Sequence, residues 1–115
     1  MPFACGKGGK PVTDWKQLQK EVYQNKLDHH FNVTDVNMEF CHLYGEVGEA
    51  YTAYRKQKPD LGEELADVAI YLLGLAEILG FDLEDQVLRK MEINRARRYQ
   101  VVDGVLRRVQ EEDSP

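Results

Sequence analysis

The sequence has little cysteine, no long hydrophobic run and no excess of positive charge. Its two cysteines, Cys5 and Cys41, have neither the spacing of a zinc site nor the number that a disulfide framework needs. No apolar run is long or pure enough for a signal peptide or a membrane span. The net charge of −5 argues against a nucleic-acid-binding surface built from basic residues. We therefore expect a soluble, cytoplasmic protein that binds neither nucleic acid nor membrane.

The length of 115 residues fits a single domain. Residues 1–12 are rich in glycine and lysine but lack the spacing of a P-loop, so we expect a flexible tail there. The remaining chain divides into an expected helical domain at 13–100 and a C-terminal extension at 101–115. Acidic residues crowd the last part of this extension, which we expect to be disordered.

Four stretches carry apolar residues at helical spacing, which predicts an all-α bundle of about four helices. Thr13 or Asp14 is the expected N-cap of the first helix, and Thr34, followed by Asp35, that of the second. Gly80 is expected to close the third helix. The predicted helices run from 13 to between 25 and 30, from 34 to about 56, from 63 to 79, and from 83 to about 99.

Beyond the fourth helix, residues 101–106 resemble a small hairpin that turns at Asp103-Gly104. A frayed extension of the helix is the alternative, because an isolated hairpin is only marginally stable. The sequence thus allows a short C-terminal hairpin beside the bundle.

The third predicted helix has almost no polar residue after Asp67. A helix that is apolar nearly all round must be surrounded by other elements. One chain of about four helices can hardly enclose it, so we expect a homo-oligomer, either a dimer or a tetramer. Gly45 and Gly48 weaken the second helix, which suggests close approach by another helix or by a ligand.

Two pairs of acids organise the middle of the chain. Glu46 and Glu49 lie three residues apart in the second predicted helix, and Glu64 and Asp67 lie three apart in the third. Residues three apart share a helix face, and the turn signal at 58–62 lets the two helices fold back on each other. Carboxylates about 5 Å apart repel by roughly 3 kcal/mol at an effective dielectric of about 20. Hard divalent cations remove that cost and bridge to phosphate, which predicts a Mg²⁺ site for a phosphorylated ligand, with Mn²⁺ as a substitute.

Further polar residues follow the same helical spacing. Lys90, Asn94 and Arg97 form a row of donors suited to phosphate oxygens on the fourth predicted helix. Glu39 and His42 share a face with the first acid pair, and by position alone we expect them to contact a base or ribose. A structural role is the alternative for His42.

The pattern Glu-x-x-Glu, a spacer and then Glu-x-x-Asp resembles that of the MazG-type all-α nucleoside triphosphate pyrophosphohydrolases. The downstream basic segment of that family is matched by the donor row, and the resemblance covers roughly residues 36–99. It implies a helical bundle with Mg²⁺ bound by this motif. It also implies cleavage between the α- and β-phosphates of a nucleoside triphosphate, which gives a monophosphate and pyrophosphate.

On this reading all four acids ligate metal, and Glu46 or Glu49 is the expected general base. One alternative is a base-specific dCTP or dUTP pyrophosphatase, and another is a non-catalytic helical module that binds nucleotides or proteins. A di-iron carboxylate protein would need a second Glu-x-x-His. No histidine follows His42, so we do not favour that class.

Overall fold

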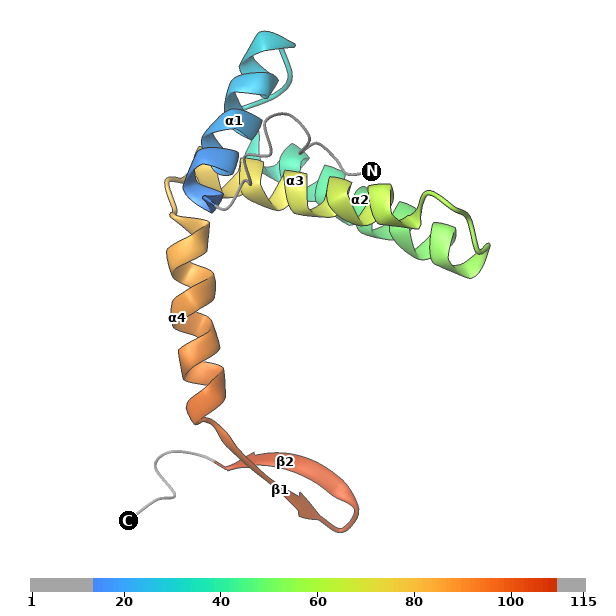
Figure 1. Cartoon of the computed structure of the whole chain (residues 1–115), viewed down its shortest axis with the longest axis vertical. Helices are drawn as coiled ribbons and strands as arrows, with labels where there is room; N and C mark the ends of the chain where they lie inside the picture. Colours follow the sequence, from blue (N-terminus) through green and yellow to red (C-terminus); the bar gives the residue numbers. More distant parts are fainter. Residues whose placement is uncertain (1–13, 110–115) are drawn as a thin grey trace, which may run out of the picture. The chain divides into compact units, whose positions relative to one another are not determined.

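The computed structural model describes residues 14–109, which form four helices and a two-stranded antiparallel hairpin (Figure 1). The predicted tail at 1–12 and the predicted disorder of the acidic end lie outside the described residues. None of the described helices is long and apolar enough to cross a membrane. The elements are α1 (Trp15–Asp28), α2 (Val36–Arg55), α3 (Leu61–Leu79), α4 (Leu83–Ala96), β1 (Arg98–Val102) and β2 (Val105–Val109). The predicted all-α fold with a short hairpin is confirmed.

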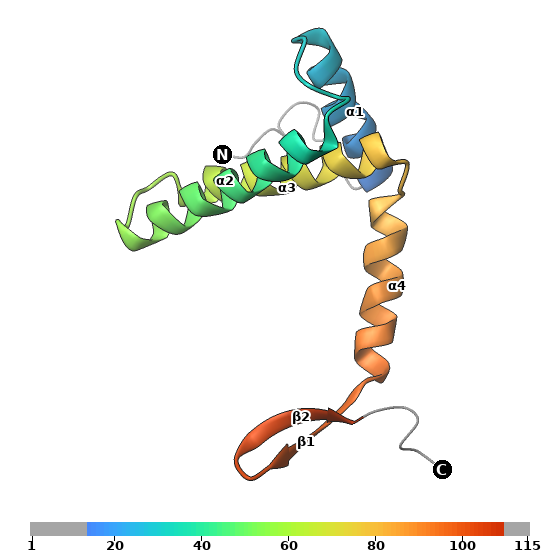
Figure 2. The ribbon, with the colours of Figure 1, turned by 180° about the vertical axis from the view of Figure 1, so that it is seen from behind.

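The chain forms two compact units, one ending at Leu83 and the other beginning at Glu84. In the first unit α2 and α3 lie side by side as an antiparallel pair, and α1 packs against α3 (Figures 1 and 2). The loop at 56–60 reverses the chain between α2 and α3, as the turn signal predicted. This reversal brings the two acid-bearing helices together.

The ends of the helices follow local side-chain chemistry. Asp14 caps α1, because its carboxylate accepts hydrogen bonds from the backbone of Lys16 and Gln17. The prediction of Thr34 as the cap of α2 was wrong, since Asp35 occupies that position and accepts from Met38 N at 3.1 Å.

The loop before α2 explains that shift. The Asn32 side chain accepts hydrogen bonds from the backbone N–H groups of Thr34 and Asp35, which holds Asp35 at the helix entrance. Helix α3 begins two residues earlier than predicted, at Leu61. Gly80 ends α3 with φ 82°, the left-handed conformation predicted for it.

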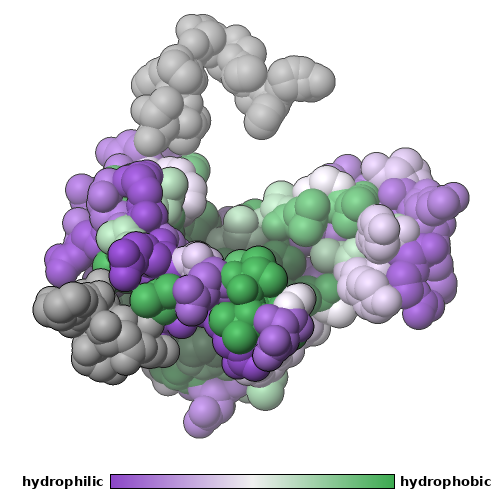
Figure 3. Space-filling view, turned by 90° about the horizontal axis from the view of Figure 1, so that it is seen from below, coloured by the Kyte–Doolittle hydropathy of each residue, from purple (hydrophilic) through white to green (hydrophobic). Residues whose placement is uncertain are grey.

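The apolar core of the described chain is small. Its buried apolar side chains are Ala50, Ala53, Leu75 and Ala76. Three of these four residues are alanines, whose small side chains let neighbouring helices approach closely. Large apolar side chains reach the surface instead, and hydrophobic residues are visible on the face shown in Figure 3.

The second unit consists of most of α4 and the hairpin. Helix α4 ends at Ala96, so the predicted end near residue 99 was wrong, and Tyr99 lies in β1. Residues 98–102 pair with 105–109, so they are extended and cannot continue the helix. Asp103 and Gly104 have φ of 53° and 78°, as a two-residue hairpin turn with two positive φ angles requires.

Candidate metal and phosphate site

The antiparallel pair brings the predicted acids together on facing helices. Glu46 and Glu49 of α2 and Glu64 of α3 each present a carboxylate oxygen, and these oxygens all lie within 4.8 Å of one another. Asp67 is not part of this three-residue group, although its charge raises the pKa of both Glu46 and Glu64. Three of the four predicted ligands are therefore close enough to share an ion, and the fourth lies within electrostatic reach.

Burial and like charge raise the pKa of two of these acids above the ordinary value. For Glu46 burial contributes most, then the charges of Glu49 and Asp67, while His42 lowers the pKa. For Glu64 burial contributes most, followed by Asp60 and Glu49. The part of each shift that comes from like charge reflects repulsion between the ionised carboxylates. A divalent cation would relieve this repulsion.

Asp60 is an additional acid at this site, and the sequence had indicated only a turn at this position. It lies four residues before Glu64, a spacing that places both on one side of the start of α3. Asp60 Oδ1 and Glu64 Oε1 are buried, and neither has a hydrogen-bond partner in the described part of the chain. Buried oxygens without partners are costly, and hard divalent ions prefer such oxygens as ligands. The donor set therefore fits a divalent metal.

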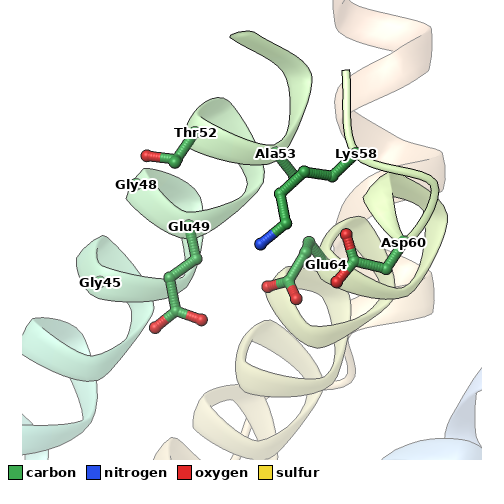
Figure 4. A pocket seen from close by; sticks show the side chains of 8 residues that line it. All are labelled: Gly45, Gly48, Glu49, Thr52, Ala53, Lys58, Asp60 and Glu64. Atoms are coloured by element: carbon green, nitrogen blue, oxygen red, sulfur yellow. The ribbon is translucent and has the colours of Figure 1, made fainter. Parts of the chain in front are cut away.

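A pocket of about 400 Å³ lies beside these carboxylates, towards the turn between α2 and α3 (Figure 4). It is lined by Gly45, Gly48, Glu49, Thr52, Ala53, Lys58, Asp60 and Glu64. Figure 4 shows the Lys58 amine and the carboxylates of Glu49 and Glu64 pointing toward the same space, whereas the Thr52 hydroxyl points away. Lys58 was not predicted from the sequence as a site residue, because a lysine in a turn is ordinarily solvated.

Hydrogen bonds at the end of α2 set the backbone position of Lys58. Its backbone N–H donates to Ala53 O at 2.9 Å, and the N–H of Gln57 donates to Tyr54 O at 3.1 Å. Gln57 has φ 53°, so the chain ends the helix with a left-handed residue and turns back over its last turn. This local structure holds the base of the Lys58 side chain beside the carboxylates.

Glu39, predicted to contact substrate, is only 1% exposed. Its carboxylate accepts from Lys26 Nζ of α1 at 2.8 Å and from Asn32 Nδ2 at 2.8 Å. Glu39 thus links α2 to α1 and to the loop between them. Its predicted contact with a base or ribose stays a prediction.

His42 lies between Glu39 and the acid group. Its Nδ1 is 3.8 Å from Glu39 Oε2, and its ring meets the ring of Tyr71 edge-on with 5.8 Å between centroids. Burial raises the pKa of Tyr71, and the charges of Glu39 and Glu46 raise it further. Tyr71 therefore lies next to the site. The sequence signal for Tyr71 was a single phenol in the largely apolar stretch that follows Asp67.

The predicted donor row belongs to the second unit. Lys90 and Asn94 lie four residues apart on α4 and therefore share a face. Arg97 follows the end of the helix, and its backbone N–H donates to Asn94 O at 3.2 Å. Their role in binding phosphate stays a prediction.

Comparison with known proteins identifies the family to which this chain belongs. The profile of the MazG-like family matches residues 37–108. A dATP/dGTP diphosphohydrolase from Cyanophage S-2L is 38% identical over 74 residues, which are 64% of this chain and 68% of the phage protein. A solved structure, the Cyanophage S-2L MazG-like pyrophosphohydrolase bound to dGDP and three catalytic Mn²⁺ ions per active site, is 30% identical and aligns with a TM-score of 0.66. That alignment covers 87% of this chain and 100% of the phage chain. The chain belongs to the MazG-like family.

Proposed function

We propose that this protein is a divalent-metal-dependent nucleoside triphosphate pyrophosphohydrolase. It would cleave the bond between the α- and β-phosphates of ribo- or deoxynucleoside triphosphates and release a monophosphate and pyrophosphate. The observation that carries the proposal is the convergence of Glu46, Glu49 and Glu64 oxygens within 4.8 Å. Membership of the MazG-like family and the activity named for the phage relatives support it.

The four acids Glu46, Glu49, Glu64 and Asp67 would hold Mg²⁺, with Mn²⁺ as a substitute. The Mn²⁺ ions in the phage structure support a divalent metal at such a site. Bound metal would acidify a coordinated water and neutralise charge on the phosphates. The protein is itself acidic, so direct binding of a free triphosphate would be repulsive without the ions.

Side chains of this protein would carry out proton transfer and substrate binding. Glu46 or Glu49 would accept the proton of the attacking water. The donor row defined above, Lys90, Asn94 and Arg97, would bind phosphate oxygens. Glu39 and His42 stand as proposed neighbours of the base or ribose.

A preference for purine deoxynucleotides is the specificity that we favour. The named activity of the phage relative concerns dATP and dGTP, and the solved phage structure holds dGDP. This preference takes the place of the dCTP or dUTP specificity considered from the sequence.

Product analysis tests the proposal directly. Purified protein is incubated with a panel of ribo- and deoxynucleoside triphosphates, with Mg²⁺, with Mn²⁺ and with chelator, and the products are separated by chromatography. We expect monophosphate plus pyrophosphate, only with metal, and fastest turnover of dATP and dGTP. Diphosphate plus orthophosphate would overturn the bond assignment. No turnover of any nucleotide would favour the non-catalytic module.

We also propose that two or more copies of this chain assemble into the functional molecule. A pocket of about 520 Å³ between α1 and α3 is lined mostly by apolar side chains, among them Leu18, Val22, Phe31, Ile70 and Leu73. Few apolar side chains are buried within the described chain, which is too small a core for a stable isolated domain. A second copy is the partner we favour, because most soluble oligomers are homo-oligomers.

A further inference from the structure

The pocket beside the acid group has a composition that suits phosphate better than a base. Two glycines, an alanine and a threonine line it together with three acids and one lysine. None of these lining residues is aromatic or a large apolar residue, so a base would find no surface on which to stack. Gly45 and Gly48 leave the α2 side of the pocket open, because nothing lies within 4 Å of where a Cβ atom would stand. With divalent cations balancing the three acids, a compact anionic group can therefore approach the helix closely.

Lys58 is the one cationic side chain among the residues that line this pocket. Its amine faces the carboxylates of Glu49 and Glu64 in Figure 4, yet it forms no ion pair with any residue that the structure describes. A phosphate bound to the acids through a metal ion would have the ion on one side and the Lys58 ammonium on the other. The ammonium is placed to make that contact.

The acid group has different chemistry at its two ends along α2. His42 and the ring of Tyr71 lie toward the start of the helix, and Lys58 lies just past its end. His42 and Glu49 are seven positions apart, which is about 10 Å along a helix. A nucleotide that spans the acid group would thus meet aromatic rings at one end and an ammonium at the other.

We propose that this pocket binds the β- and γ-phosphates of the substrate, the groups released as pyrophosphate, and that Lys58 contacts them directly. The proposal rests on the proposed function and adds an orientation to it. The nucleoside lies toward His42 and Tyr71, and the terminal phosphates lie toward the α2–α3 turn.

The test compares Lys58→Met with Lys56→Met, a neighbouring lysine that does not line the pocket. Inhibition constants are measured for pyrophosphate and for nucleoside monophosphate in the presence of Mg²⁺. We expect Lys58→Met to weaken inhibition by pyrophosphate about 10- to 100-fold, the loss typical of one charge-assisted contact. Inhibition by monophosphate should change by less than about two-fold, and Lys58→Arg should restore part of the loss.

Two results would overturn the proposal. One is an unchanged inhibition constant for pyrophosphate, or an equal loss for both products. The other is a change in Mn²⁺ affinity alone, measured by titration calorimetry, which would assign Lys58 to balancing the carboxylate charge.

Failure of the proposed function would look different. If the wild-type protein hydrolyses no nucleotide, pyrophosphate binding to the Mn²⁺-loaded protein is measured by calorimetry for the wild-type chain and both methionine variants. Binding that depends on Lys58 but not on Lys56 would then support the pocket without the activity. Binding of equal strength in all three proteins would overturn it.

Discussion

At the scale of single residues, the glycines of α2 occupy positions where the described chain leaves open space. Gly45 and Gly48 line the pocket, and nothing lies within 4 Å of where their Cβ atoms would stand. No other helix of the described chain therefore accounts for them. The sequence predicted close approach by another helix or by a ligand. A ligand, or a helix of another subunit, remains as the explanation.

Substituting Gly48→Ala should separate stability from activity. Alanine favours the helix by up to about 1 kcal/mol, so we expect a higher melting temperature together with slower turnover, because the methyl group protrudes into the pocket. The control is Gly62→Ala in the first turn of α3, where a Cβ also meets nothing within 4 Å and which does not line the pocket. Thermal melts measure the stability of the two variants, and steady-state kinetics measure their turnover. A Gly48→Ala enzyme of unchanged turnover would contradict a ligand at this face.

Glu49→Gln should remove one charge from the acid group. Because Glu49 is exposed, we expect the metal-free protein to be unchanged or stabilised by at most about 1 kcal/mol. The rise in melting temperature on adding Mn²⁺ should be largely lost, since fewer carboxylates bind the ion. Glu63→Gln, in the same first turn of α3 as Glu64 but outside the acid group, serves as the control. An undiminished Mn²⁺ effect in Glu49→Gln would count against its role as a ligand.

At the scale of elements, one buried lysine joins the three helices of the first unit. Lys26 of α1 forms an ion pair with Glu39 of α2 and lies 5.2 Å from the centroid of the Tyr71 ring of α3. Its aliphatic stem packs against Gly74. A Cβ atom added to Gly74 would lie 3.5 Å from Lys26 Cε and 3.6 Å from Lys26 Cδ. This arrangement sets the position of α1 against the pair of helices that carries the acids.

Glu39→Gln should be strongly destabilising. It removes the counter-charge of Lys26, whose side chain is 9% exposed, and we expect a loss of about 3 kcal/mol in the free energy of unfolding. Chemical denaturation of the metal-free protein measures it. The double variant Lys26→Met/Glu39→Leu should recover most of the loss, because no charge is then left buried. A double variant as unstable as the single one would show that the Lys26–Glu39 pair stabilises the fold through its packing and not through its charges.

The acids between α2 and α3 make the metal-free protein sensitive to pH. Glu46 and Glu64 have folded-state pKa values raised above the ordinary 4.5, so the fold favours their protonated forms. Their contribution to stability is present below that value and is lost as the pH rises through the folded pKa.

We therefore expect the metal-free protein to become more stable, relative to a Glu64→Gln variant, as the pH falls from neutral toward the ordinary pKa of 4.5. Thermal melts across this range with chelator present measure the difference. Saturating Mn²⁺ should abolish it by neutralising the carboxylates at the higher pH. A difference between the two proteins that does not vary with pH would contradict the repulsion inferred from the geometry.

At the scale of the whole molecule, residues 14–109 expose many large apolar side chains. Phe31 is 55% exposed and Ile70 45% exposed, and both line the pocket between α1 and α3. We expect sedimentation to show a dimer or tetramer. Ile70→Asp should give a smaller species with a lower melting temperature, because a carboxylate cannot be buried unpaired against another copy. Asn37→Asp, on the exposed start of α2, is the control. A wild-type monomer at micromolar concentration would contradict the assembly.

The sequence alone determined the features that depend on neighbours along the chain. Helical periodicity located all four helices, and Asp103-Gly104 located the hairpin, because spacing and turn chemistry are local. Two acid pairs at i, i+3 around a turn also predicted the convergence of Glu46, Glu49 and Glu64, since antiparallel helices leave little choice of where one face points.

Only the tertiary structure decided which other groups join these acids. Lys26 lies 13 residues from Glu39, and no periodicity pairs them. Tyr71 and Lys58 come to the site through helix packing and through the left-handed residue that ends α2, and neither is encoded by a motif. The strand pairing of 98–102 ended α4 before Arg97, overriding a helical pattern. Contacts between distant segments depend on how whole helices pack, so they emerge only when the chain is folded.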